Sequence, residues 1–173
     1  MRTRHEILEI EPIIEVIIVS DSRFIKILKE SVYDVGESGE YVYRYFKEKN
    51  FKIYYPIIIP NSKSIIKSTI KYLIRRLNVN TVITIGGTGI SKKDKTVDAV
   101  LELSEKIVEG FGELFRRYSE EELGPHTILS RACAVVYRRA IIFALPGSLN
   151  AVKIGVERII EPTLKHVLSE IYR

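Results

Sequence analysis

The sequence predicts an α/β fold, a three-layer sandwich in which a mostly parallel, doubly wound sheet carries helices on both faces. Short apolar runs rich in β-branched residues, of which residues 81–85 (TVITI) are the clearest, alternate with longer segments of helical periodicity. The turn-forming residues cluster directly after these runs, where strands would end. A length of 173 residues with a hydrophobic fraction of 46% suffices for one domain with a substantial core.

The apolar runs predict five strands, of which the last two form a distinct pair. These two are joined only by Arg138 and Arg139, so we expect an antiparallel edge pair. Longer segments separate the other strands and leave room for the crossovers of a parallel sheet. The predicted strands are residues 13–19, 51–59, 81–85, 132–137 and 140–145.

Apolar residues at helical spacing predict helices between and after the strands. Ser62 and Thr96 are placed to cap two of them, and Gly110 and Gly112 interrupt the pattern between two others. Pro162 is expected near the end of the last helix or in a kink, with the final turns reaching the C-terminal residues. The predicted helices are residues 39–49, 63–77, 97–107, 111–121 and 149–160.

Residues 24–38 show no clear period. They are expected to form a loop, and loops of this length are often functional.

Residues 13–173 are expected to form a single domain, preceded by an exposed N-terminal arm, residues 1–12, that ends at a proline. We expect the apolar residues of this arm to dock on a neighbour; they are Ile7, Leu8 and Ile10.

Charge and composition exclude several classes of protein. The net charge is +5, but the charges are spread along the chain and no nucleic-acid motif is present, so we expect no nucleic-acid partner. The apolar runs are too short to span a bilayer, and we expect no membrane partner. Cys133, the one cysteine, is expected to pack as a small hydrophobe, and the chain is expected to be cytoplasmic.

A glycine-rich loop directly after residues 81–85 is the strongest local indication of a ligand site. Gly86, Gly87 and Gly89 allow positive φ and a close approach of a ligand to the main chain, whose N–H groups can cradle phosphate. Asp94 follows between two lysines, so an anion cradle and a carboxylate lie close in sequence. This pattern favours phosphate or nucleotide chemistry with a metal, although a structural turn is the alternative for the loop alone.

The other special turns should meet this loop in space. In a parallel sheet the carboxyl ends of the strands share one edge, and ligands bind there. The turns at residues 20–21, 60–61 and 146–148 each follow a predicted strand. We therefore expect one cleft lined by Asp21, Asn61, the glycine loop, Asp94 and the Pro146-Gly147-Ser148 turn.

Several segments together resemble one known family. Residues 84–89 (TIGGTG) followed by residues 93–99 (KDKTVDA) resemble the T-x-G-G-T-G-x-x-x-R-D-x-T-P-E-A pattern of the molybdopterin-binding MoaB/Mog family of molybdenum cofactor biosynthesis. The resemblance extends in collinear order from about residue 13 to residue 168. The further matching segments are Ser20-Asp21, residues 37–39 (ESG), 109–113 (EGFGE), 129–132 (LSRA) and 145–148 (LPGS).

The resemblance implies an adenylyltransferase. It implies that molybdopterin is adenylylated by ATP with Mg²⁺, that pyrophosphate is released, and that the product is used for molybdate or tungstate insertion. It also implies a homo-oligomer, a hexamer or a trimer, and a downstream metal-insertion enzyme as a partner. Charge neutralisation and in-line alignment of two phosphate groups are what such a reaction requires of a protein.

The resemblance also assigns roles to individual residues. Asp94 and Ser130 are the expected catalytic residues, and Asp94 and Asn61 the expected metal ligands. Ser130 has a structural alternative, in which its hydroxyl bonds its own backbone at the start of a strand. The expected substrate-binding residues are Ser20, Asp21, Ser38, Gly39, Gly86, Gly87, Thr88, Gly89, Arg131, Pro146, Gly147 and Ser148.

The chain departs from the family pattern at four positions. Asn61 stands where active adenylyltransferases have Asp, which removes a charge that a metal would use. Glu37 replaces a commoner Asp, while Val97 and Leu149 replace prolines. Asn61 therefore favours an alternative, a homologue that binds pterin or nucleotide without turnover. A related nucleotide-pyrophosphate hydrolase is the third hypothesis.

Overall fold

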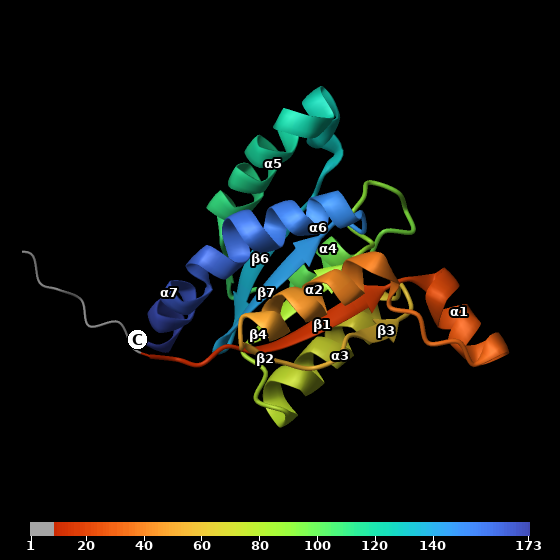
Figure 1. Cartoon of the computed structure of the whole chain (residues 1–173), viewed down its shortest axis with the longest axis horizontal. Coiled ribbons are helices and arrows are strands. Elements are labelled where there is room, and N and C mark those ends of the chain that lie inside the picture. Colours follow the sequence, from red (N-terminus) through yellow and green to blue (C-terminus); the bar gives the residue numbers. More distant parts are fainter. Residues whose placement is uncertain (1–8) are drawn as a thin grey trace, which may run out of the picture.

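A mixed sheet forms the middle layer of the computed structural model, which describes residues 9–173 (Figure 1). In this described part the sheet has seven strands. Six of them follow the order β2-β1-β4-β7-β6-β5, and the seventh, β3, also pairs with β1. The strands are β1 (Ile13–Val19), β2 (Lys52–Ile53), β3 (Ile57–Ile59), β4 (Thr81–Ile85), β5 (Lys106–Ile107), β6 (Cys133–Tyr137) and β7 (Ala140–Leu145).

Most neighbouring strands run parallel, as predicted. β1 is parallel to β2, β3 and β4, and β4 is parallel to β7. β6 and β7 form the expected antiparallel pair, with Tyr137 opposite Ala140 across the turn. The short strand β5 was not predicted, and it lies outside this pair, antiparallel to β6.

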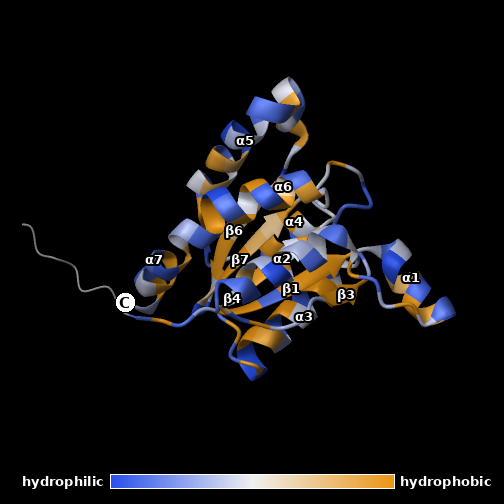
Figure 2. Cartoon of the chain, in the orientation of Figure 1, coloured by the Kyte–Doolittle hydropathy of each residue, from blue (hydrophilic) through white to orange (hydrophobic). Residues whose placement is uncertain are grey.

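Helices cover both faces of the sheet, which confirms the three-layer sandwich (Figure 1). One apolar cluster packs α2, α5, α6 and α7 on one face, and a second packs α3 and α4 on the other. Figure 2 shows the resulting pattern, apolar strands between amphipathic helices. The helices are α1 (Asp21–Glu30), α2 (Gly36–Glu48), α3 (Lys63–Arg76), α4 (Thr96–Leu103), α5 (Glu109–Leu123), a 3-10 turn (Gly124–Leu129), α6 (Leu149–Gly155), a π-helical turn (Val156–Ile160) and α7 (Glu161–Tyr172).

The predicted loop at residues 24–38 is wrong. Helix α1 includes residues 24–30 of this segment, and α2 begins at Gly36 rather than at residue 39. α1 has no fully buried residue: Phe24 and Ile27 pack partly against the core, and Leu28 is 69% exposed. The helix is instead specified at its start, where the Ser20 hydroxyl accepts a hydrogen bond from the Arg23 N–H.

Three other boundaries also differ from the prediction. The strand predicted at residues 51–59 is split into β2 and β3, because Pro56 has no N–H to donate to a ladder. The helix predicted at residues 97–107 ends at Leu103, and its last two residues form β5. Gly110 and Gly112 lie inside α5 rather than between helices. Gly112 allows α5 to pack closely on the sheet side, since a Cβ there would be 2.8 Å from the Ala132 carbonyl oxygen.

The predictions for the two helix caps and for the last helix can also be compared with the structure. Ser62 does precede α3, but its hydroxyl makes no capping hydrogen bond. Thr96 is the first residue of α4 and not its cap, because its hydroxyl donates to the glycine loop instead. The last helix runs through the π-helical turn and then continues past Pro162, which lies at the start of α7, where a missing N–H is best tolerated.

The N-terminal arm is described only from residue 9 onward. Ile10 packs against the core of its own chain, and Pro12 is buried. Ile7 and Leu8, for which docking was also predicted, lie outside the described residues. Across residues 9–173 no helix combines the length and the apolar composition that a membrane crossing requires.

Candidate active site

Two adjacent cavities lie at the carboxyl ends of the central strands, where one cleft was predicted. The first, the loop cavity, has a volume of about 400 Å³ and the second, the α2 cavity, about 350 Å³. Both are lined by Gly86 and Gly147, so these two glycines form the boundary between them. The predicted residues that line the loop cavity are Gly86, Gly87, Thr88, Gly89, Asp94, Ser130, Pro146, Gly147 and Ser148. Ser20 and Ser38 line the α2 cavity.

The glycine loop begins where three strands end together. Gly86 has a φ of 99°, and a Cβ there would lie 2.6 Å from the carbonyl oxygen of Val19, the last residue of β1. Its N–H donates to the carbonyl of Leu145, the last residue of β7, at 3.0 Å. Only glycine fits this approach, so the loop starts in a fixed position at the ends of β1, β4 and β7.

The other side of the loop is fixed by the start of α4. The Thr96 hydroxyl donates to the Gly86 carbonyl at 2.7 Å, and the Thr96 N–H donates to the Gly87 carbonyl at 3.0 Å. Gly87 also has a positive φ, of 64°. These two bonds use loop carbonyls, so among the bonds that hold the loop only the one from Gly86 to Leu145 uses a loop N–H group that could contact a bound anion.

Asp94 lies over the glycine loop. A Cβ on Gly89 would be only 2.7 Å from Asp94 Oδ2, and the same oxygen accepts a hydrogen bond from the Ser91 N–H at 3.1 Å. Asp94 is the only carboxylate that lines the loop cavity among the described residues. The Asp94 carboxylate and the residues of the glycine loop thus line one cavity, as the sequence predicted.

Ser130 and Ser148 line the same cavity from other segments. Ser130 Oγ lies 3.4 Å from the Ala132 N–H, which is the structural contact considered for it, yet the residue also lines the cavity. Ser148 caps α6, and its Oγ accepts from the Ala151 N–H at 3.3 Å. Both hydroxyls keep their protons available for a ligand, because each accepts from a backbone N–H.

The two cavities are connected by a hydrogen bond from α2. Ser38 Oγ donates to the Gly147 carbonyl at 2.9 Å, which ties the start of α2 to the turn after β7. Arg23 lines the α2 cavity and pairs with Asp34. The pKa of Asp34 is lowered, first by the hydrogen bond from the Gly36 N–H and then by Arg23.

Asp21 and Asn61 come together but line neither cavity. Asp21 Oδ1 accepts from the Asn61 N–H at 2.8 Å, and Asn61 Oδ1 accepts from the Lys95 N–H at 3.1 Å. A Cβ on Gly87 would lie 3.0 Å from Asn61 Oδ1. The Asp21–Asn61 pair therefore links the start of α1 to Gly87 and Lys95, which lie on either side of Asp94 in the sequence. The Asn61 side-chain oxygen already accepts a hydrogen bond from the backbone.

Arg131 and Gly39 are also outside both cavities. Arg131 Nη2 donates to Asp98 Oδ1 at 2.6 Å, and this bond lowers the pKa of Asp98 and raises that of Arg131. Gly39 is buried where α2 crosses β1, and a Cβ there would lie 2.9 Å from Ile18 Cδ1. Gly39 thus allows close packing of α2, and Arg131 is engaged by a residue that was not singled out from the sequence.

Sequence reasoning missed one wall of the loop cavity. This wall comes from α5 and the 3-10 turn, which lie far from the glycine loop in sequence. The resembling segments at residues 109–113 and 129–132 were the indications of it. Its members are Phe115, Ser119, Leu123, His126, Thr127 and Leu129. The cavity therefore has a polar side, the loop with Asp94, and a more apolar side that suits a flat ring.

The Cys133 thiol has a clear chemical state. Burial raises the pKa of the Cys133 thiol to about 11, so it stays protonated, in agreement with packing as a hydrophobe.

No cluster of three or more His, Cys, Asp or Glu that could hold a metal ion occurs within residues 9–173. A Mg²⁺ ion held by one carboxylate together with phosphate oxygens is compatible with Asp94 alone.

Comparison with known proteins identifies the family to which this geometry belongs. The family model described as "Probable molybdopterin binding domain" matches residues 15–166. The chain belongs to this molybdopterin-binding family. The matched range includes every strand from β2 to β7 and every residue of the loop cavity.

Individual relatives of the molybdopterin-binding family agree over nearly the whole chain. A Methanocaldococcus jannaschii protein named "Probable molybdopterin adenylyltransferase" is 39% identical over 156 residues, covering 90% of this chain and 91% of that protein. A solved structure of molybdenum cofactor biosynthesis protein B has a TM-score of 0.85 at 32% identity, covering 95% of this chain and 98% of its own. The structure of a Pyrococcus furiosus protein, called a tungsten cofactor synthesizing protein, has a TM-score of 0.78 at 32% identity, with 94% and 98% covered.

Proposed function

We propose that this protein adenylylates molybdopterin with Mg-ATP and releases pyrophosphate, ahead of molybdate or tungstate insertion in molybdenum cofactor biosynthesis. One observation carries the proposal: the glycine loop, Asp94, Ser130 and the Pro146-Gly147-Ser148 turn line a single cavity. The name of the Methanocaldococcus jannaschii relative, at 39% identity, supports the same reaction.

In the proposed reaction an oxygen of the molybdopterin phosphate attacks the α-phosphorus of ATP. A new P–O–P bond forms, the bond between the α- and β-phosphates breaks, and pyrophosphate leaves with its electron pair. The N–H groups of the glycine loop hold phosphate oxygens, and the fixed loop aligns the attack in line. Mg²⁺, held by Asp94 with the phosphates, supplies charge neutralisation when bound.

The rest of the cavity binds and orients the pterin substrate. The side formed by Phe115, Leu123 and Leu129 is apolar and takes the flat ring system. Ser130 and Ser148 have hydroxyl protons to donate to polar atoms of the ligand. We therefore expect Ser130 to contact the substrate directly.

The second candidate is a protein that binds molybdopterin or nucleotide without turnover. Asn61 favours it, because the position that would supply a second carboxylate carries a neutral amide whose oxygen accepts from the Lys95 N–H. A single carboxylate in the cavity is a weak metal site without substrate phosphates.

The test is to incubate the protein with molybdopterin and Mg-ATP and to quantify adenylylated pterin and pyrophosphate. The proposal predicts equal amounts of both products. Tight pterin binding with no adenylylated product would leave the binding-only candidate. Release of AMP from ATP without pterin would instead indicate a nucleotide-pyrophosphate hydrolase.

The setting of the reaction follows from the same proposal. We expect a cytoplasmic homo-oligomer, trimeric or hexameric, that passes its product to a metal-insertion enzyme. Ile128, at 79% exposed, and Leu129, at 49%, lie beside the loop cavity and are apolar surface that an oligomer would cover. Sedimentation velocity would show a species larger than one chain; a monomer at micromolar concentration would contradict this expectation.

A further inference from the structure

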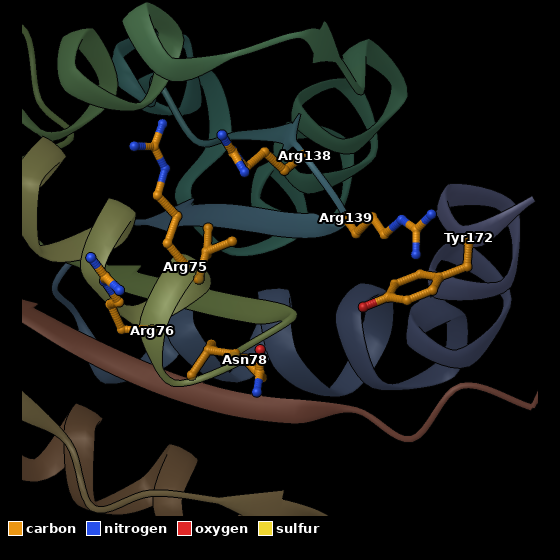
Figure 3. Close-up of a pocket in the computed structure, with 8 residues that line it drawn as sticks. Arg75, Arg76, Asn78, Arg138, Arg139 and Tyr172 are labelled. Atoms are coloured by element: carbon orange, nitrogen blue, oxygen red, sulfur yellow. The ribbon is translucent and has the colours of Figure 1, made fainter.

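A second concave site lies at the other end of the sheet from the glycine loop. The arginine cavity, of about 650 Å³, is lined by Arg75 and Arg76 at the end of α3, Arg138 and Arg139 between β6 and β7, and Tyr172 at the end of α7 (Figure 3). Arg139 directly precedes β7, so the cavity lies at the amino end of that strand. β7 has six residues, and at about 3.3 Å per residue the strand separates this cavity from the loop cavity by roughly 20 Å.

The four arginines have no acidic partner in the described part of the chain. None of them takes part in an ion pair within residues 9–173, and no carboxylate is among the residues that line the cavity. Like charges gathered at one site repel each other, and a bound anion would relieve this repulsion.

Tyrosine side chains hold three of the guanidinium groups in place. Arg75 Nη2 donates to the Tyr137 hydroxyl at 2.6 Å, and the Arg138 guanidinium lies 6.0 Å from the centre of the same ring. Arg139 lies 5.6 Å from the centre of the Tyr172 ring. These contacts reduce the freedom of long side chains, so less entropy is lost when an anion binds.

The backbone at Arg138 gives an independent reason to expect a role for its side chain. Arg138 has a φ of 55° at the first position of the two-residue turn between β6 and β7. Glycine or asparagine is the usual residue there, because a side chain with a Cβ is strained at positive φ. The sequence thus keeps a cation where a glycine would be more stable.

We propose that the arginine cavity binds a small anion with two or more linked phosphate groups. Guanidinium groups bind phosphate oxygens in pairs, and four of them match the charge of linked phosphates better than that of a single phosphate. The arginines surround a cavity rather than following an extended groove or stripe, which favours a small ligand over nucleic acid.

The probe is inorganic pyrophosphate, added to the full chain at low ionic strength without Mg²⁺. We expect amide chemical shifts of residues 138–140 and 172 to move on titration, in addition to any change at the glycine loop. Binding at this cavity should weaken as salt is raised, because its arginines are solvent-exposed. Inorganic phosphate should bind at least tenfold more weakly than pyrophosphate at the same residues.

Substitutions separate this site from the loop cavity. Arg138→Gly and Arg76→Gln should each weaken pyrophosphate binding at the arginine cavity roughly tenfold, and Arg138→Gly should also raise the melting temperature. Arg117→Gln, which removes an exposed charge on α5 outside the cavity, is the matched control and should leave this binding unchanged.

Three results would overturn the proposal. One is the absence of shift changes at residues 138–140 and 172 at millimolar pyrophosphate. Another is equal binding by Arg138→Gly, Arg76→Gln and the Arg117→Gln control. The third is tighter binding of a short single-stranded oligonucleotide than of pyrophosphate through the same arginines. A protein without adenylyltransferase activity would still bind pyrophosphate here, so failure of the proposed function leaves this test intact.

Discussion

Asp94 is the residue on which the proposed chemistry depends, because it is the only carboxylate lining the loop cavity in the described residues. Asp94→Asn keeps the size and the Oδ acceptor of the side chain but removes its charge. We expect adenylylation to fall on the order of a hundredfold, with molybdopterin affinity nearly unchanged. Steady-state rates and pterin binding measured on both proteins check this, and retained turnover would remove Asp94 from the metal role.

Asn61 permits the opposite experiment at a neighbouring position. Asn61→Asp keeps an oxygen that accepts from the Lys95 N–H, so the loop should keep its position. The substitution adds a negative charge beside the segment that carries Asp94, which Asn61 contacts at Lys95 and Gly87. If the wild-type protein is a weak enzyme because that charge is missing, activity at low Mg²⁺ should rise by about tenfold. An unchanged dependence of the rate on Mg²⁺ would show that position 61 does not affect the metal.

Glu15 predicts a pH dependence of stability rather than of catalysis. It is 4% exposed in the middle of β1, and burial raises its pKa from 4.5 to about 7. The folded chain therefore holds this proton up to about pH 7, and the unfolded chain only up to about 4.5. The stability that Glu15 contributes at low pH is lost as pH rises through about 7, a change of about 3 kcal/mol.

Glu15→Gln removes this titration and keeps an oxygen that can accept the Val16 N–H. Urea unfolding at pH 5 and pH 8 should show a variant that gains stability over the wild type as pH rises. Glu113→Gln, at an exposed position on α5, serves as the control and should follow the wild type at both values. Parallel curves for wild type and Glu15→Gln would contradict the buried, protonated state of Glu15.

At the scale of elements, the glycine loop is held by contacts that a side chain would break. Gly86→Ala would place a Cβ 2.6 Å from the Val19 carbonyl oxygen at a φ of 99°, so we expect a loss of roughly 2–4 kcal/mol. Gly110→Ala in α5 meets nothing within 4 Å and should stabilise by roughly 0.5 kcal/mol. Chemical denaturation of both variants tests the contrast, and equal effects would mean that the loop is not fixed at Gly86.

The elements that sequence reasoning found are those that bury apolar residues with a clear period. β1, β4, β7 and α3 were predicted closely, because their burial is visible in the order of residues. The apolar residues of α1 do follow a helical spacing, but they bury little surface: Phe24 and Ile27 pack only partly against the core, and Leu28 is exposed, so the segment was not recognised as a helix. β5 was missed because two residues carry no period, and its pairing with β6 depends on a partner distant in sequence.

At the scale of the whole molecule, parallel topology explains why the site could be predicted in outline. The turns after β4 and β7 had to meet because those strands are parallel neighbours, and the structure places them together around the loop cavity. The α5 wall could not be predicted, since its position depends on packing across one face of the sheet. The ion pair between Arg131 and Asp98 is likewise a tertiary contact, which the sequence of neither segment indicates alone.

The same topology gives the molecule two separate sites at opposite ends of its central strands. The loop cavity combines a carboxylate with the glycine loop, whereas the charged residues that line the arginine cavity are all arginines. Metal-assisted phosphoryl transfer fits the first of these, and simple anion binding fits the second. A ligand with phosphates thus has two places to bind, and its position in a complex distinguishes them.

A crystal structure of the protein soaked with ATP and Mg²⁺ is the most direct test of the central claim. The proposed function predicts the α-phosphate beside the glycine loop, with Mg²⁺ between a phosphate oxygen and Asp94. Nucleotide bound only in the arginine cavity, with the loop cavity empty at saturating ATP, would contradict it.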